Sequence, residues 1–137
     1  MNTNKKSAGI GSSAKLSALW ASLMFLYIYA DHISLFGTGQ IEEMMAGRMG
    51  PFPVTQVSLL LAAILMLVPS LMVFLATIMK PGLNRWVNII LGALYTLVNI
   101  SNLIGGTWIF YIFIGVVEIA LTLLIIWHAW KLPTFEG

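Results

Sequence analysis

Four long apolar runs occupy most of this chain, and they constrain its fold more than any other feature. They cover about residues 16–36, 54–79, 85–104 and 108–130. Each run is long enough to cross the roughly 30 Å hydrocarbon layer of a bilayer as a helix. A soluble domain could not bury all four, because only 9% of the 137 residues are charged and too little polar surface would remain. The chain is therefore predicted to be an all-α integral membrane protein.

The connections between the runs predict an antiparallel four-helix bundle. Residues 80–84 contain a Pro-Gly pair and residues 105–107 contain two glycines, so we expect tight turns at both places. Pro69 removes a backbone donor from the second run and is expected to bend that helix. The runs and turns together define one four-span domain over residues 16–130.

The first connection is longer and has a pattern of its own. Residues 39–49 predict a short interfacial helix, because their apolar side chains share one helical face. Glu42 and Glu43 fall in its first turn and Arg48 in its last, as the helix dipole prefers. This helix could be a spacer, or it could be a lid over the outer mouth of the bundle.

The basic residues predict the orientation of the bundle. With four spans, six of the seven lysines and arginines lie on one side of the membrane and Arg48 lies alone on the other. The positive-inside rule then places both termini in the cytoplasm. Residues 1–15 and 131–137 are therefore expected to be cytoplasmic segments.

Polar and small residues recur at steps of three and four in the first, third and fourth runs, and more weakly in the second. This spacing defines one face of a helix, and polar faces in lipid turn towards neighbouring helices. The four expected inward stripes are Trp20, Met24, Tyr27, Asp31 and Ser34; Gln56, Ala63, Ser70 and Thr77; Asn88, Gly92, Tyr95, Asn99 and Asn102; and Tyr111, Gly115, Glu118 and Thr122.

The depth of these residues predicts a polar pocket in the outer half of the bundle. At about 1.5 Å per residue, Asp31 lies roughly 8 Å from the outer end of its helix and Glu118 roughly 15 Å in. Gly115 is expected to leave space between the two acids. The candidate ligand-binding or proton-binding residues are Glu118, Asp31, Asn99, Tyr95, Tyr27, Asn102, Tyr111 and His32.

Glu118 is the most informative of these residues. An ionisable side chain in a membrane span is costly and marks a functional site by default. Its carboxyl group is expected to be protonated, or to be hydrogen-bonded by the hydroxyls of Tyr27 and Tyr95. The alternative is that Glu118 only holds helices together.

Several function classes are excluded by what the sequence lacks. Without cysteine there is no thiolate ligand or cysteine nucleophile. The two histidines, His32 and His128, are predicted at opposite sides of the membrane, so we expect no haem, metal or other cofactor. A net charge of +2 is too small to suggest nucleic acid as a partner. No catalytic motif is present, so we do not expect an enzyme.

Three fragments carry a resemblance to a known group of proteins. They are residues 27–31 (YIYAD), residues 84–88 (NRWVN), and Glu118 together with residues 126–130 (IWHAW). The chain resembles the short bacterial four-helix membrane proteins of unassigned function within the DoxX-like group. This resemblance implies a location in the bacterial inner (cytoplasmic) membrane and no established activity. Some DoxX-like proteins are small subunits of quinone-reducing membrane enzymes, so it also implies a subunit or quinone-contact role.

A fainter similarity, of architecture only, is to the emopamil-binding family of four-helix sterol isomerases and receptors. That family places two acids in a lipophilic cavity, as Asp31 and Glu118 could be placed here. The motifs of the family are not matched residue by residue, so its isomerase chemistry is not carried over to this chain.

Three functions fit these observations. The first is a protein that binds a lipophilic small molecule or a quinone, or that serves as an accessory subunit of a membrane complex or homo-oligomer. The second is a proton-coupled transporter that acts as a dimer and uses Glu118. The third is an enzyme that uses Asp31 and Glu118 as acid and base. The first function is favoured by the expected pocket with apolar and polar walls, by the possible interfacial lid and by the missing catalytic motif.

Overall fold

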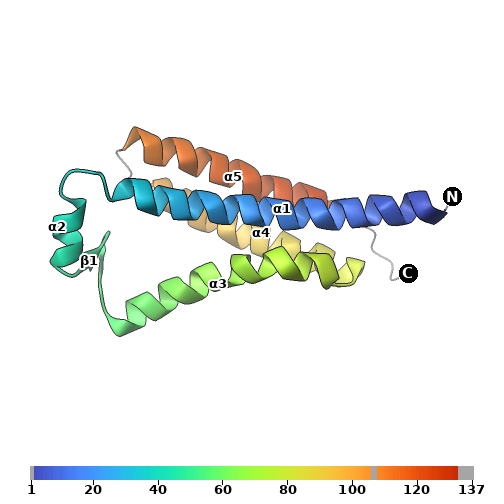
Figure 1. The fold of residues 1–137 in the computed structure, drawn as a ribbon, viewed down its shortest axis with the longest axis horizontal. Helices are drawn as coiled ribbons and strands as arrows, with labels where there is room; N and C mark the ends of the chain where they lie inside the picture. Colours follow the sequence, from blue (N-terminus) through green and yellow to red (C-terminus); the bar gives the residue numbers. More distant parts are fainter. Residues whose placement is uncertain (1, 106–107, 133–137) are drawn as a thin grey trace.

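A computed structural model describes residues 2–105 and 108–132, and most of these residues are helical. Four long helices run alternately up and down as a bundle, and a short helix and a two-stranded hairpin join the first two (Figure 1). The all-α four-helix prediction is confirmed. The elements are α1 (Asn2–Ser34), α2 (Gln40–Met45), β1 (Arg48–Met49), β2 (Phe52–Pro53), α3 (Gln56–Ile78), α4 (Pro81–Leu103) and α5 (Ile109–Trp130).

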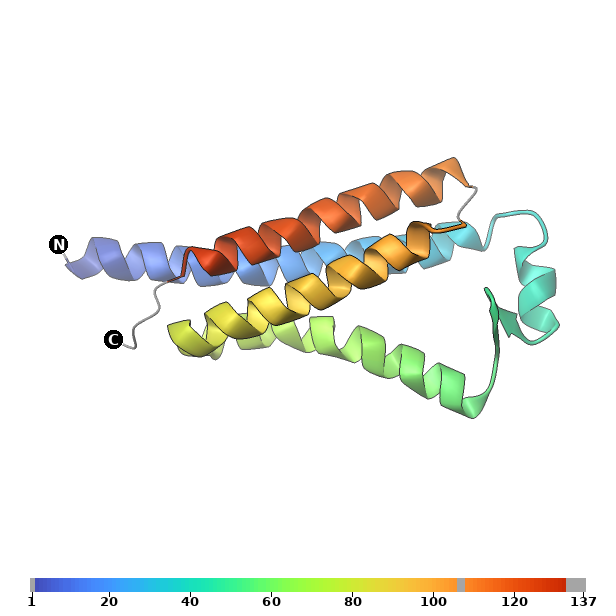
Figure 2. The same ribbon diagram turned by 180° about the vertical axis from the view of Figure 1, so that it is seen from behind.

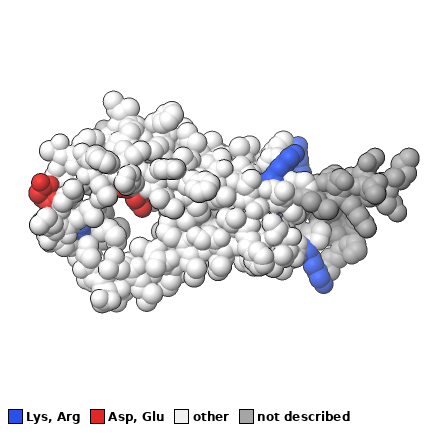
Figure 3. All heavy atoms as spheres, viewed as in Figure 1, with Lys and Arg blue, Asp and Glu red and all other residues white. Residues whose placement is uncertain are grey.

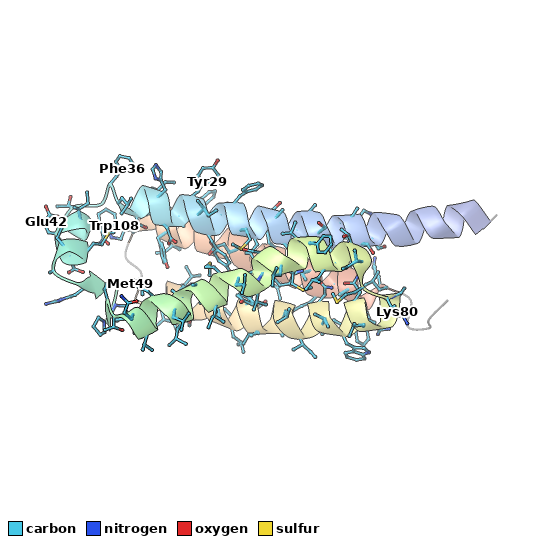
Figure 4. All side chains as sticks on the ribbon, turned by 60° about the horizontal axis from the view of Figure 1, so that its bottom comes forward. Tyr29, Phe36, Glu42, Met49, Lys80 and Trp108 are labelled. Carbon is cyan, nitrogen blue, oxygen red and sulfur yellow. The ribbon has the colours of Figure 1, made fainter. Side chains whose placement is uncertain are left out.

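Each long helix contains a segment that is long and apolar enough to cross a membrane. In α1 this segment is Gly11–Ser34, and in the other three it is the whole helix. The two ends of the bundle carry different groups: α2 and the hairpin lie at one end, and Lys80 lies at the other (Figure 4). We refer to these as the α2 end and the Lys80 end.

The helices pack as three neighbouring pairs, α3 with α1, α1 with α5, and α5 with α4. The buried residues of α1, α4 and α5 follow one another at steps of three and four, which is the spacing of helices that pack along a common seam. The inward stripes predicted for these three helices are confirmed at Trp20, Tyr27, Asn88, Gly92, Tyr95, Asn99, Gly115, Glu118 and Thr122.

The inward face predicted for the second span is wrong. The buried residues of α3 are Pro69, Met72 and Ala76, and the four predicted residues are all exposed: Gln56, Ala63, Ser70 and Thr77. The Ser70 hydroxyl donates to the Met66 carbonyl at 2.7 Å. The Thr77 hydroxyl donates to the Phe74 carbonyl at 2.6 Å. Because these hydroxyls find acceptors on their own helix, they do not need to face a neighbouring one.

The first half of α3, residues 56–68, diverges from the other helices. It contains no buried residue, and the space between α3 and α4 widens towards the α2 end (Figures 1 and 2). The helix starts at a capping box, in which Thr55 Oγ1 accepts from the Ser58 N–H at 3.0 Å and Ser58 Oγ accepts from the Thr55 N–H at 2.8 Å. It then continues through Pro69 and changes direction near its middle (Figure 1).

Two connections differ from the prediction. Residues 81–84 form the first turn of α4 and not a loop, because Pro81 stands at a position where its missing N–H costs nothing. The predicted interfacial helix at residues 39–49 is limited to Gln40–Met45, and Arg48 lies in the hairpin. Gly50, at φ +61°, supplies the positive φ that this hairpin turn requires. Residues 106 and 107 of the second predicted turn lie outside the described residues.

Candidate functional site

A cavity of about 90 Å³ lies inside the α2 half of the bundle, between α1, α3, α4 and α5. Five of the eight predicted site residues line it: Tyr27, Asp31, Asn102, Tyr111 and Glu118. The remaining wall is apolar and is formed by Ala30, Leu65, Met66, Val98 and Ile114. Residues from all four long helices therefore meet at one small polar space.

Glu118 lies on the buried face of α5 and is only 5% exposed. Its side chain lines the cavity. Among the hydrogen bonds and ion pairs of the described residues, none involves its carboxylate. This side chain faces space that a ligand group or water could occupy.

The hydroxyls of Tyr27 and Tyr95 do not hydrogen-bond to Glu118, so that alternative of the prediction is wrong. The Tyr27 hydroxyl donates to Asn99 Oδ1 at 2.5 Å. The Tyr95 hydroxyl donates to the Leu65 carbonyl at 2.5 Å. Because a phenol has a single proton to donate, both hydroxyls are committed elsewhere. Asn99 and Tyr95 are buried behind the cavity and do not line it.

Asp31 stands one turn beyond Tyr27 on α1 and borders both the inner cavity and a second, larger one. This outer cavity of about 410 Å³ lies between the end of α1 and the segment formed by α2 and β1. Its lining includes Asp31, His32, Glu43 and Arg48. Asp31 is the one residue that lines both cavities. His32 borders only the outer cavity, and its ring packs edge-on against Phe36 at 5.6 Å between centroids.

Gly115 does not leave open space between the two acids, so that prediction is wrong as well. A Cβ atom added at this position would overlap the side chain of Leu103 from α4. Leu103 therefore fills the volume that the glycine leaves. Gly115 allows α4 to pack closely on α5. The cavity is bordered by Glu118 and not by Gly115.

The Lys80 half of the bundle is closed by a buried chain of amide hydrogen bonds. Trp20 Nε1 donates to Asn88 Oδ1 at 2.7 Å, and Asn88 Nδ2 donates to the Asn84 carbonyl at 2.7 Å. Asn84 Nδ2 donates to the Ala76 carbonyl of α3 at 2.8 Å. Asn84 was predicted to lie in a turn, so this chain of hydrogen bonds was not predicted from the sequence. The signal was available in the four-residue spacing of Asn84 and Asn88, which puts both on one helical face.

The charged groups that border the inner cavity are all acidic. The inner cavity is bordered by two acids, Asp31 and Glu118, and by no lysine, arginine or histidine. Within residues 2–105 and 108–132, no group of three or more histidines, cysteines or acids is arranged to hold a metal ion. The site can bind a polar group or exchange a proton, and it offers no paired acid and base in contact.

Comparison with known proteins assigns the chain to a family. The profile of the family described as "Family of unknown function (DUF6326)" matches residues 11–135. The chain belongs to this family. The match covers all four candidate spans and the residues of both cavities. Neither the curated proteins nor the solved structures contain a match. The family description assigns no activity, so a function must be argued from the site.

Proposed function

We propose that this protein is a multi-pass protein of the bacterial inner membrane that binds a lipophilic small molecule. The ligand would place a polar group in the cavity beside Glu118. The observation that carries the proposal is the state of this side chain: it is 5% exposed, it borders the cavity, and its carboxylate has no partner among the described residues. Apolar cavities with a few convergent polar groups are the usual form of small-molecule sites.

The size of the cavity limits what can enter it. Sites for drug-sized ligands have volumes of about 300–1,000 Å³, whereas this cavity has about 90 Å³. It can therefore hold a head group and not a whole lipophilic molecule. The remainder of the ligand would lie where the bundle is open, against the first half of α3. That half supplies the cavity wall residues Leu65 and Met66 and buries no side chain of its own.

Native mass spectrometry of the protein, extracted gently from its own membrane, tests this proposal. We expect a reproducible extra mass on the wild-type assembly that is lost in Glu118→Gln. The matched control is Glu42→Gln, which removes the same charge from an exposed acid on α2 that borders neither cavity. The proposal is wrong if the extra mass survives in Glu118→Gln, or if the wild-type protein carries none.

An accessory-subunit role is part of the same proposal. The first half of α3 supports it, because a helix segment with no fully buried residue leaves most of its surface free for another chain. The resemblance to the DoxX-like group makes a quinone-reducing complex the first partner to seek. The same measurement would reveal a reproducible heteromeric mass if this chain is a subunit.

A proton-coupled transporter is the second candidate. It is favoured by the position of Asp31, which borders both cavities and so provides a polar route from the α2 end to Glu118. The Lys80 half is closed around Trp20 and Asn88, so a pathway across the membrane would need a dimer or a large rearrangement. Glu118→Gln would then abolish pH-driven flux in liposomes. Flux that continues in this variant would rule the transporter out.

A further inference from the structure

We propose that the head group in this cavity is a cation, an ammonium group carried on an apolar chain. This inference rests on the proposed function and adds the chemical class of the ligand. It is carried by the charges of the cavity walls, by the position of Glu118 and by the volume of the cavity.

The inner cavity is bordered by two acidic side chains, and no basic residue of its wall would balance their charge when they ionise. Two acids, Asp31 and Glu118, border this cavity, and none of the other lining residues is basic. The outer cavity adds Glu43 and His32 and contains a single arginine, Arg48. No ion pair joins Arg48 to an acid in the part of the chain that the structure describes.

The remaining described cations lie far from the site. Lys15, Lys80, Arg85 and Lys131 belong to the Lys80 end, and acidic side chains are seen at the α2 end and beside the opening between α1 and α3 (Figure 3). The Lys131 ammonium packs over the Trp127 ring at 3.5 Å, and the Arg85 guanidinium over the Trp130 ring at 4.4 Å. These cations therefore cannot neutralise the two acids of the cavity.

Two acids that border one small cavity repel each other when both are ionised, and the burial of Glu118 limits how far water can screen this repulsion. A bound cation relieves this repulsion and gives both acids an oppositely charged partner. A neutral ligand leaves it unchanged, and a carboxylate or phosphate would add a further negative charge. The cavity should therefore select cations over neutral molecules, and neutral molecules over anions.

The other walls also suit an ammonium group. Tyr27 and Tyr111 border the cavity, and aromatic rings attract cations. A volume of about 90 Å³ accommodates a primary ammonium group; one water molecule occupies about 30 Å³ of the liquid. The apolar wall residues Ala30, Leu65 and Ile114 would contact the first carbons of the attached chain.

Three probes with the same twelve-carbon chain test the inference: dodecylamine, dodecanol and dodecanoate. The full-length protein would be placed in nanodiscs of phosphatidylcholine, and probe binding would be measured against empty nanodiscs to remove the contribution of the lipid. We expect dodecylamine to bind at least about tenfold more tightly than dodecanol, and dodecanoate to bind most weakly. Glu118→Gln should remove the preference for the amine, and Glu42→Gln should leave it unchanged.

Cavity-filling variants separate this inference from the proposed function. Ala30→Leu and Ile114→Phe each enlarge a side chain of the cavity wall, so a probe that uses the cavity should bind neither variant. The cation inference is overturned if dodecanol or dodecanoate binds the wild-type protein as tightly as the amine does, and if this binding is lost in the cavity-filling variants. The proposed function itself fails if every probe binds the wild-type and both filled proteins equally. Two variants are used so that one that folds poorly does not decide the result.

Discussion

Tyr95 donates a hydrogen bond of 2.5 Å to the main-chain carbonyl of Leu65, and this is the carbonyl that Pro69 leaves without a partner in α3. In an α-helix the N–H of residue 69 would bond to the carbonyl of residue 65, and proline has no N–H to donate. A side chain of α4 therefore replaces the missing backbone bond. The bond ties α4 to α3 at the place where α3 begins to diverge.

Tyr95→Phe should lower the free energy of unfolding by about 1 kcal/mol, because the Leu65 carbonyl loses its donor in an apolar setting. Denaturation by sodium dodecyl sulfate in mixed micelles measures this change. The matched control is Tyr29→Phe, since Tyr29 is 57% exposed and points away from the bundle (Figure 4). We expect the control to unfold like the wild-type protein.

A double-mutant cycle with Pro69→Ala tests the reason for that change. Alanine at position 69 restores the backbone donor for Leu65, so Tyr95→Phe should cost less in the Pro69→Ala background than in the wild type. An equal cost in both backgrounds would show that the Tyr95 hydroxyl does not act by replacing the backbone donor that Pro69 lacks.

Asn88→Ala should lower the free energy of unfolding by about 1–3 kcal/mol, because the fully buried Trp20 N–H loses its acceptor. Asn102→Ala removes the same kind of side chain from an exposed position on the same helix, and it should change the free energy of unfolding by less than about 0.5 kcal/mol. Thermal unfolding in detergent compares the two variants. Similar melting temperatures would mean that the amide chain of the Lys80 half does not stabilise the bundle.

Gly92→Ala should push α4 away from α5. An added Cβ would lie 2.8 Å from Ile126 Cγ1 and 3.4 Å from the Thr122 carbonyl oxygen. Overpacking of this kind costs about 1–3 kcal/mol, and Ile126→Ala in the same chain should recover part of it. Gly11→Ala is the control, because nothing lies within 4 Å of its added Cβ. A destabilised Gly11→Ala protein with an unaffected Gly92→Ala protein would contradict the close packing of α4 on α5.

The orientation of the bundle can be tested because the chain has no cysteine, so a single introduced thiol is the only one present. The positive-inside rule predicts that the Lys80 end faces the cytoplasm. A membrane-impermeant maleimide should label Glu42→Cys in intact spheroplasts and label Lys80→Cys only after the cells are opened. The reverse pattern would invert the orientation and place the termini outside.

Much of the architecture could be predicted from the sequence because lipid leaves few choices. Apolar runs of sufficient length must form helices, and short connections must make them antiparallel. The spacing of polar residues identified the buried face of α1, α4 and α5, and it correctly placed Glu118 on that face. Asp31 and Asn102 belong to the same stripes, but the bundle opens towards the α2 end, so both are exposed there while still bordering the cavity.

The tertiary structure decided the partners of each polar group. Periodicity gives the face of a helix relative to its own axis, but it does not say which atoms meet across the interface. The hydroxyls of Ser70 and Thr77 donate hydrogen bonds to carbonyls of α3 itself. The polarity of these residues therefore did not identify the inner face of this helix. Tyr27 and Tyr95 found acceptors other than Glu118, and that left the Glu118 carboxylate facing a cavity without a partner. The sequence by itself determined that an acid is buried in the bundle. Only the packing of four helices determined that it is unpaired, because a hydrogen bond depends on positions within a few tenths of an ångström.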